Sequence, residues 1–162
     1  MLMTSKDRVL QRERDRGRAA ALNLAGRAHE MTGTAIIAEQ GHIPAWREDA
    51  VYEAKHVGFP LQYEDQVYIL TMPHTPAHNP GMFPKDLPAI YSRKNTTDPK
   101  LAKDWMAPYG ESGKYLKGDC ARDGGYVWQS GFDGQNTWRP TEVELTNPGL
   151  WIKLGTVEEI QG

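Results

Sequence analysis

Aromatic and amide side chains near the end of the chain have the types and the spacing that sugar recognition needs. The chain has five Trp and seven Tyr but three Phe. Indole and phenol rings combine an apolar face with a polar edge, so they pack against a pyranose ring while neighbouring polar groups bind its hydroxyls. The same rings also suit the core of a very small domain. The candidate sugar-binding residues are Tyr126, Trp128, Trp138 and Trp151, with Asp133, Gln135 and Asn136 of the intervening loop.

Residues with catalytic or metal-binding potential are scattered, and their patterns do not predict an enzyme. His74 and His78 are four residues apart, but Pro76 prevents the helical arrangement that would direct both imidazoles to one metal ion. A glycosidase needs two carboxylates about 5–10 Å apart across a cleft, whereas we expect Glu142 and Glu144 on a solvated edge strand. The sequence therefore predicts no catalytic residue, no metal ligand and no cofactor.

Cysteine content, charge and hydropathy exclude further classes. Cys120 is the one cysteine, so an internal disulfide framework and a cysteine-based zinc cluster are excluded, and we expect it to act as a small buried apolar side chain. The formal net charge of -2 argues against general nucleic-acid binding. No run of about 18 apolar residues is present that would cross a membrane. Residues 1–18 have charges but not the apolar stretch of a secretory signal.

Two short runs of β-type residues predict strands in the part of the chain that follows the helical segment. Gln66–Met72 and residues 125–130 alternate or nearly alternate between apolar and polar side chains, and each follows an acidic residue and a turn. The tight-turn residues 123–125 (DGG) predict a hairpin that pairs residues 118–121 with residues 126–130.

These strands belong to a pattern that occurs twice. Aligning Tyr68 with Tyr126 places both strands before loops rich in Pro, Asn and Gly, and residues 87–91 (LPAIY) then match residues 147–151 (NPGLW) with an offset of two. Chance similarity is the alternative, because few identities support the match. The expected organisation is a helical segment at 1–45, a first β module at 46–94, a polar linker at 95–104, a second β module at 105–155 and a tail at 156–162.

The N-terminal segment differs from the rest in charge and in pattern. Residues 1–30 hold seven Lys or Arg against four Asp or Glu, and the remainder holds 12 against 17. Residues 5–31 have no Pro and predict a helix capped by Ser5, and residues 34–40 predict a short second helix. Residues 11–18 are polar apart from one glycine, so the helix has nothing to bury there. We expect it to pack on another chain or a larger assembly, with a solvated charged face as the alternative.

A series of short motifs runs through the second module. In order they are Tyr115-x-x-Gly118-Asp119, Gly125-Tyr126-x-Trp128, Trp138-x-Pro140 and Leu150-Trp151. This order resembles the small chitin-binding modules of carbohydrate-binding families five and twelve. Tyr126 and Trp128 share one face of their strand, as a joint platform or as joint core. In that family the Gly-x-x-Tyr element and the final Trp are largely structural, so the resemblance implies that Trp128 and Trp138 are exposed. The first module departs more, with Tyr91 where the final Trp would be.

The layout of residues 20–155 is also similar to a group of phage tail and prophage proteins. The shared elements are an Ala/Leu-rich helix, the entry Pro44-Ala-Trp46, the loop pair His74-Thr75 and the element Trp138-Arg-Pro140. That resemblance implies a virion or tail-tip component that is made in the host cytoplasm.

Three functions remain open on these grounds. The first is a non-catalytic tail or baseplate accessory protein that binds cell-surface polysaccharide and attaches to other virion proteins through its helix. The second is a structural virion protein whose modules pack on other subunits, and the third is the polysaccharide-binding part of a secreted hydrolase system. Weak single sites make a homo-oligomer useful, and a trimer would fit tail symmetry. The expected fold class is α+β, with an N-terminal helix or helices followed by two small antiparallel β modules of a few short strands each; neither nucleic acid nor membrane insertion is expected.

Overall fold

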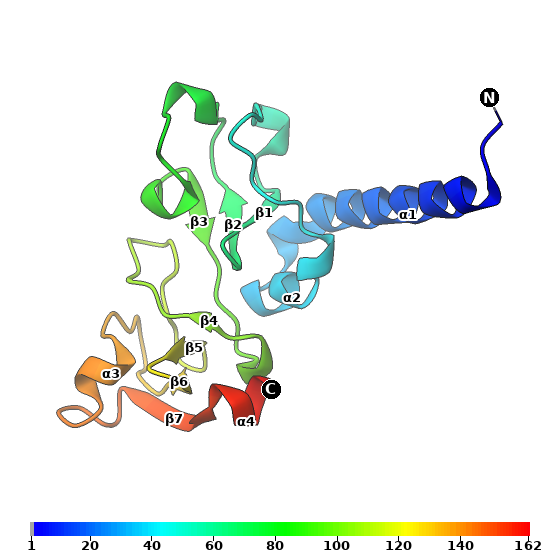
Figure 1. Ribbon diagram of the computed structural model, residues 1–162. Helices are drawn as coiled ribbons and strands as arrows, with labels where there is room; N and C mark the ends of the chain where they lie inside the picture. The colour runs from blue at the N-terminus through cyan, green and yellow to red at the C-terminus, as the bar shows by residue number, and fades with distance from the viewer. Residues whose placement is uncertain (1) are drawn as a thin grey trace.

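The computed structural model describes residues 2–162 and confirms the α+β class. A long helix, α1 (Ser5–Arg27), and a short one, α2 (Gly33–Ala38), precede a three-stranded antiparallel sheet and a four-stranded mixed sheet (Figure 1). Short 3-10 turns connect the elements at Ala28–Glu30, Gln40–His42, Ala54–His56, Pro76–His78, Pro84–Asp86 and Pro99–Leu101.

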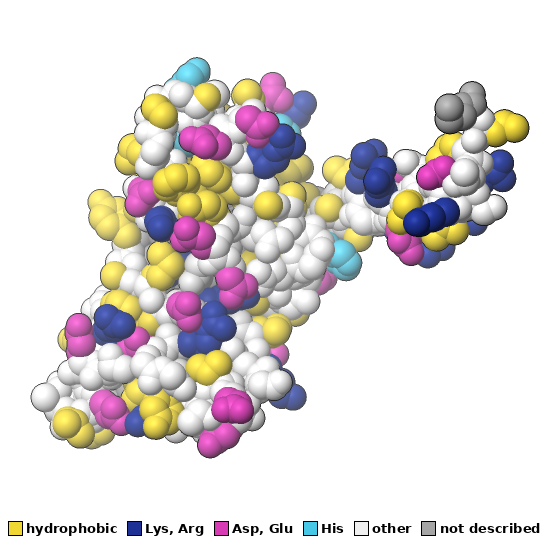
Figure 2. Space-filling model, viewed as in Figure 1, with side chains coloured by type: hydrophobic (Ala, Val, Ile, Leu, Met, Phe, Trp, Pro, Cys, Tyr) yellow, Lys and Arg dark blue, Asp and Glu magenta, His cyan; other side chains and the backbone are white. Residues whose placement is uncertain are grey.

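Helix α1 begins at Ser5, as predicted, but ends at Arg27 and not at residue 31, and it projects away from the body. Thr4, not Ser5, is the N-cap: its hydroxyl accepts from the backbone N–H of Asp7, while the Asp7 carboxylate accepts from the Thr4 backbone. Figure 1 shows the first two thirds of α1 standing clear of both sheets. Figure 2 shows Lys and Arg side chains over this arm, where the apolar Val9 and Leu10 are also exposed.

The root of α1 is fixed by an apolar cluster. Leu24 and Ala28 are buried against Ile36, Ile37 and Val67, so the helix end, α2 and the first sheet share one small core. Thr32 caps α2 through the backbone N–H of Ala35. This cap shifts the helix toward the N-terminus from the predicted range 34–40.

The first sheet has the order β1-β2-β3, with β1 at Pro60–Tyr63, β2 at Gln66–Leu70 and β3 at Tyr91–Arg93. The strand predicted at 66–72 is confirmed over 66–70. Glu64 and Asp65 join β1 to β2 with φ of 47° and 63°, the positive values of a type I′ turn. The core beneath this sheet contains Trp46, Leu61, Tyr68, Leu70 and Tyr91.

The second sheet has the order β4-β5-β6-β7. Its strands are β4 (Lys103–Asp104), β5 (Cys120–Asp123), β6 (Tyr126–Ser130) and β7 (Trp151–Thr156), with α3 (Pro140–Val143) before β7 and α4 (Val157–Gln161) after it. Strand β4 is parallel to β5 and the other pairs are antiparallel. The predicted hairpin forms, with its first strand at residues 120–123 and not at the predicted 118–121, and Gly124 and Gly125 form its turn with φ of 58° and 82°. Glu142 lies in α3 and Glu144 follows it, so the predicted edge strand is wrong here: Pro140 starts a helical turn instead.

The two sheets repeat the same backbone hydrogen bonds. Gly58 N donates to Leu70 O at 2.8 Å, and Gly118 N donates to Ser130 O at 2.8 Å. Thr71 N donates to Ile90 O at 2.8 Å, and Gly131 N donates to Leu150 O at 3.0 Å. Each residue of the second set lies 60 positions after its counterpart, which makes Trp128 the counterpart of Tyr68 and Trp151 that of Tyr91. The alignment of Tyr68 with Tyr126 is therefore wrong by two residues, and the offset it required disappears.

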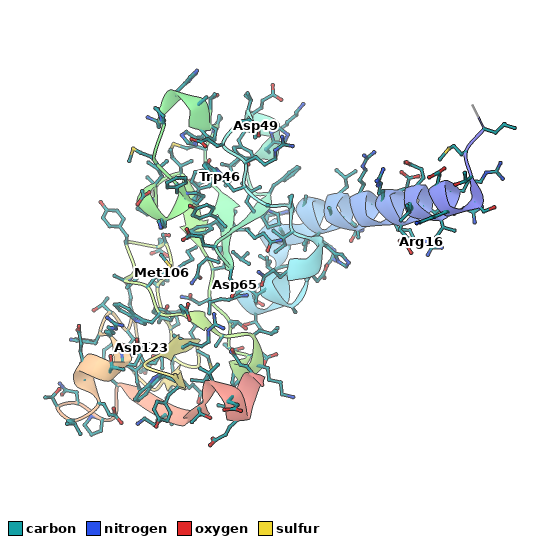
Figure 3. The ribbon with its side chains drawn as sticks, viewed as in Figure 1. Arg16, Trp46, Asp49, Asp65, Met106 and Asp123 are labelled. Atoms are coloured by element: carbon teal, nitrogen blue, oxygen red, sulfur yellow. The ribbon has the colours of Figure 1, made fainter. Side chains whose placement is uncertain are left out.

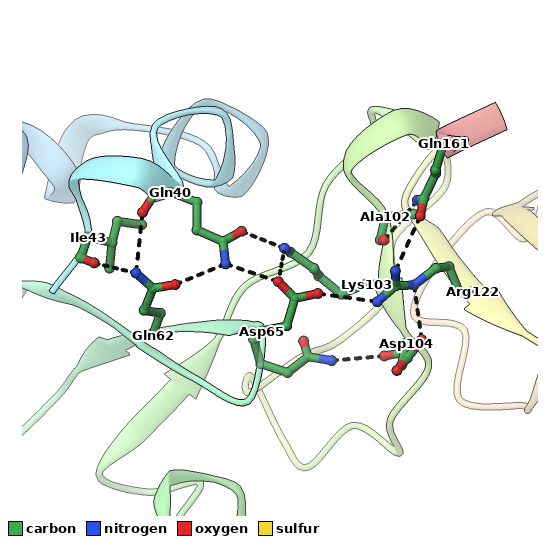
Figure 4. A network of polar contacts seen from close by, with 10 residues as sticks. Gln40, Ile43, Gln62, Asp65, Ala102, Lys103, Asp104, Arg122 and Gln161 are labelled. Carbon is green, nitrogen blue, oxygen red and sulfur yellow. Dashed lines mark hydrogen bonds and ion pairs between the residues drawn. The ribbon is translucent and has the colours of Figure 1, made fainter. Parts of the chain in front are cut away.

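The segment predicted as a polar linker is part of the packed structure. Within residues 95–104, Thr96 and Ala102 are buried and the last two residues form β4. Asp65, in the turn of the first hairpin, accepts from Lys103 Nζ at 2.8 Å and from Arg122 Nη2 at 3.3 Å (Figure 4). It also accepts from Gln40 Nε2. This network joins the helical segment, the first sheet and the second sheet, so the modules are not separated by a free linker.

Candidate functional site

Among the four aromatic residues that the sequence predicts to bind sugar, Trp138 is the one that is exposed. It lies in the loop at residues 131–139, here named the Trp138 loop, and 43% of its surface is exposed. Phe132 of the same loop packs edge-on against it, with ring centroids 5.6 Å apart and an interplanar angle of 81°. The pair forms a small aromatic surface of the type that packs against a pyranose ring.

Hydrogen bonds behind Trp138 hold its backbone in place. Its N–H donates to Asn136 Oδ1 at 3.3 Å, and its carbonyl accepts from Trp151 Nε1 at 2.8 Å. Asn136 is fully buried and donates through Nδ2 to Ser130 Oγ and Leu150 O. Asn136 and Trp151 are thus positioning residues of the platform, and their burial rules out the direct sugar contact that the sequence predicts for them.

A charged pair clamps the end of the Trp138 loop to the hairpin turn. Arg139 Nη2 donates to Asp123 Oδ1 at 2.9 Å, and Arg139 Nε lies 3.1 Å and 3.2 Å from the two oxygens. Thr141 donates to Asp123 from both its backbone and its hydroxyl. Burial raises the pKa of the Asp123 carboxyl, but the hydrogen bonds from Arg139 and Thr141 outweigh burial and hold that pKa below its ordinary value. Sequence reasoning used Asp123 as a turn residue only, because its partner Arg139 lies 16 residues further along the chain and no local pattern marks the pair.

Trp128 is core, contrary to the expectation that it is exposed. Its exposed fraction is 1%, and its indole Nε1 donates to the Asp123 carbonyl at 2.9 Å. Strand β6 lies between β5 and β7, so the Trp128 ring is enclosed with Tyr115 and Trp151 in one cluster. Tyr126 is half-buried and packs against Trp128 with ring centroids 6.4 Å apart. The pair on this face is therefore joint core and not a joint platform.

The polar residues of the Trp138 loop remain in reach of solvent. Asp133 and Gln135 are exposed, and Gln135 Nε2 donates to the carbonyl of Gly110 at 3.3 Å. The structure thus brings together Trp138, Phe132, Asp133 and Gln135 on one loop. Sequence reasoning did not name Phe132, although its place in the same loop as Trp138 was visible.

The other reactive side chains are tied into structural contacts. His74 is buried, and its ring nitrogens pair with the Tyr91 hydroxyl at 2.7 Å and with Asn79 Oδ1 at 3.0 Å. Cys120 is buried, and burial raises the pKa of its thiol to about 12, which matches the small buried side chain expected from the sequence. Residues 2–162 contain no group of three or more His, Cys, Asp or Glu placed to hold a metal ion. None of the helices among these residues has the length and apolar character needed to span a membrane.

The chain was compared with models of protein families and with curated proteins, and neither comparison finds a match. The geometry of the Trp138 loop and the projection of α1 are the features that bear on function.

Proposed function

We propose that the protein is a non-catalytic accessory protein of a phage tail or baseplate that binds host-surface glycans through the Trp138 loop. One observation carries the binding part of this proposal: Trp138 is a solvent-facing indole whose backbone is held on both sides by buried groups. A ring held in this way loses little conformational entropy when a sugar packs on it. Asp133 and Gln135 are exposed hydrogen-bonding residues of the same loop.

The α1 arm supports attachment to other chains. Its first two thirds stand clear of both sheets (Figure 1), and its apolar residues Val9 and Leu10 are exposed. Most helical stability in proteins comes from tertiary packing, so burial of these apolar side chains against another chain would stabilise the helix. The proposed partners are other virion proteins and further copies of this chain. Several copies would raise the avidity of weak sugar sites.

A purely structural role in the virion is the second candidate. An apolar groove of about 330 Å³ lies where α1 meets the first module, lined in part by Ala21, Leu22, Val51 and Phe59. Leu22 is 69% exposed there. A neighbouring subunit that covered this groove would bury those side chains without any sugar being bound.

Binding of the full-length protein to insoluble bacterial cell-wall polysaccharide and to chitin tests the proposal. Trp138→Ala should lower the affinity about fivefold or more, because truncation of a central aromatic residue costs about 1 kcal/mol or more. Leu145→Ala is the matched control, since Leu145 is an exposed apolar residue of the same module outside the loop. Retention of neither polysaccharide by the wild-type protein would refute glycan binding and leave the structural role.

A further inference from the structure

Arg93 of β3 is a buried cation with no carboxylate beside it. Its exposed fraction is 4%, and it takes part in none of the ion pairs within 4.0 Å among residues 2–162. Its guanidinium donates through Nη2 to the carbonyls of Met106 at 2.8 Å and Gly113 at 3.2 Å. Its Nε is buried without an acceptor. A buried charge that lacks a counter-charge is costly.

In the second module the equivalent cation is Lys153, which is exposed and has a carboxylate beside it. Arg93 pairs across strands with Tyr68 in the first sheet, and Lys153 pairs with Trp128 at the equivalent place in the second. Lys153 Nζ lies over the Trp128 ring, 5.0 Å from its centroid, and forms an ion pair with Glu144. The residue 60 positions before Glu144 is Pro84. The first module therefore keeps the cation but has a proline where the neutralising carboxylate would be.

Both Pro84 and Arg93 line a cavity of about 620 Å³ between the two modules. Tyr68, Ile90, Met106 and Tyr109 form other parts of its wall, and Figure 3 shows Met106 between the modules. Tyr109 is 71% exposed at its mouth. Lys85 and Asp86 also line the cavity, and the Asp86 carboxylate accepts from the backbone N–H of Phe83. The guanidinium carbon of Arg93 lies 5.8 Å from the centroid of the Tyr115 ring. The cavity thus combines apolar and aromatic walls with a cation that forms no ion pair, a combination that suits an anionic ring-bearing ligand.

We infer that this cavity binds the carboxylate of an acidic sugar residue, such as a hexuronic acid, beside Arg93. The ligand carboxylate takes the place that Glu144 has beside Lys153, and the sugar ring packs against Tyr109 and the proline walls. This inference rests on the proposed glycan-binding function, and it adds a second subsite with a defined substrate charge. It also assigns a role to Tyr109, whose ring is exposed at the junction of the modules.

Calorimetric titration of the full-length protein with trigalacturonate tests the inference, with the fully methyl-esterified trisaccharide as the neutral counterpart. The acid form should bind about tenfold to hundredfold more tightly than the ester, the range expected for hydrogen bonds to a charged group. Pro84→Glu should supply the missing carboxylate and weaken trigalacturonate binding by a similar factor. Pro84→Gln is the matched control of nearly equal size and no charge, and it should keep most of the binding.

Circular dichroism melting of both variants shows that they are folded before binding is compared. Equal binding of the acid and the ester, or equal loss in the Glu and Gln variants, would overturn the inference. Displacement of trigalacturonate by a short peptide with a free C-terminal carboxylate would overturn the assignment to sugars.

If trigalacturonate does not bind but cell-wall retention depends on Trp138, the acidic subsite fails and the proposed function stands. If trigalacturonate binds and Trp138→Ala has no effect on retention, the Trp138 platform fails instead.

Discussion

The first and second modules have one backbone framework and two different surfaces. In both, an entry tryptophan donates its backbone N–H to the first hairpin strand: Trp46 to Gln62 O and Trp105 to Arg122 O, each at 2.8 Å. In both, the central strand carries a buried aromatic residue, Tyr68 or Trp128. The framework is retained because a module this small depends on a few large buried rings for its core.

The loops that follow the central strands differ in what they present. Trp138 faces solvent in the second module, and the residue 60 positions earlier is the exposed His78. The second loop is clamped by the Arg139–Asp123 pair, whereas Asn79 of the first loop bonds to the buried His74 ring. Loops tolerate such change because they add little to the core. The second module thus exposes an aromatic residue where the first exposes a histidine, and only the first places a buried arginine at the cavity between the modules.

The largest expected effect tests whether Trp128 is core. Trp128→Ala should lower the free energy of unfolding by about 3–5 kcal/mol, because it empties the centre of the second module. Chemical denaturation monitored by near-ultraviolet circular dichroism measures the change. Tyr68→Ala at the equivalent place should likewise destabilise the first module. A loss of unfolding free energy below about 1 kcal/mol for Trp128→Ala would show that the ring is not enclosed. Trp128 and Tyr68 would then not be equivalent core residues.

A smaller effect is expected where the modules differ. Asp123→Asn should lower the free energy of unfolding by about 1–3 kcal/mol, since it weakens five hydrogen bonds from Arg139 and Thr141. The pKa of Asp123 is lowered in the folded state, so its contribution is present above the unfolded value of 3.8 and is lost as the pH falls through the lower folded value. Thermal melting between pH 2 and 7 should therefore show a smaller acid loss in the variant than in the wild type.

The exposed Asp133 of the same loop provides the control for that experiment. Asp133→Asn should leave both the unfolding free energy and its pH profile unchanged within about 0.5 kcal/mol. If Asp123→Asn and Asp133→Asn give the same unfolding free energy and the same pH profile, the Arg139–Asp123 pair does not hold the Trp138 loop. The difference between the two loops would then not be explained by that pair.

The smallest effect on stability is expected from the arm. Removal of residues 2–17 should change the unfolding free energy of the two modules by less than about 0.5 kcal/mol, because these side chains do not pack on the body. Chemical denaturation measures this change, and light scattering should show a smaller mass for the truncated protein if α1 joins copies of the chain. Loss of folding on truncation would show that the arm belongs to the core of the first module.

Local chemistry explains which parts of the fold were predictable. The turn of the second hairpin needs positive φ at two successive residues, which Gly124 and Gly125 adopt readily, so this hairpin could be placed from the sequence. The first hairpin turn uses Glu64 and Asp65 at positive φ, and the sequence marks it less clearly because these residues adopt that region less readily than glycine.

The repeat was detectable, but its register was not fixed by the aromatic residues. A Tyr matches a Tyr more closely than a Trp, which favours aligning Tyr68 with Tyr126. The identities that support the period of 60 residues are Gly58 and Gly118, Val67 and Val127, Pro80 and Pro140, and Pro88 and Pro148. The glycine pair defines the register better, because Gly58 and Gly118 both have positive φ, of 92° and 95°.

By itself, the sequence determined the α+β class, the hairpin of the second module, the small buried role of Cys120 and the presence of a charged helix before the strands. Periodicity, turn residues and composition set these features locally. The tertiary structure decided which rings face outward, because burial depends on the strands that flank a residue and not on its own type. It enclosed Trp128, Trp151 and Asn136, left Trp138 in solvent, and buried Arg93 without a carboxylate at the junction of the two modules. That last arrangement arises only where two modules meet, which no local pattern encodes.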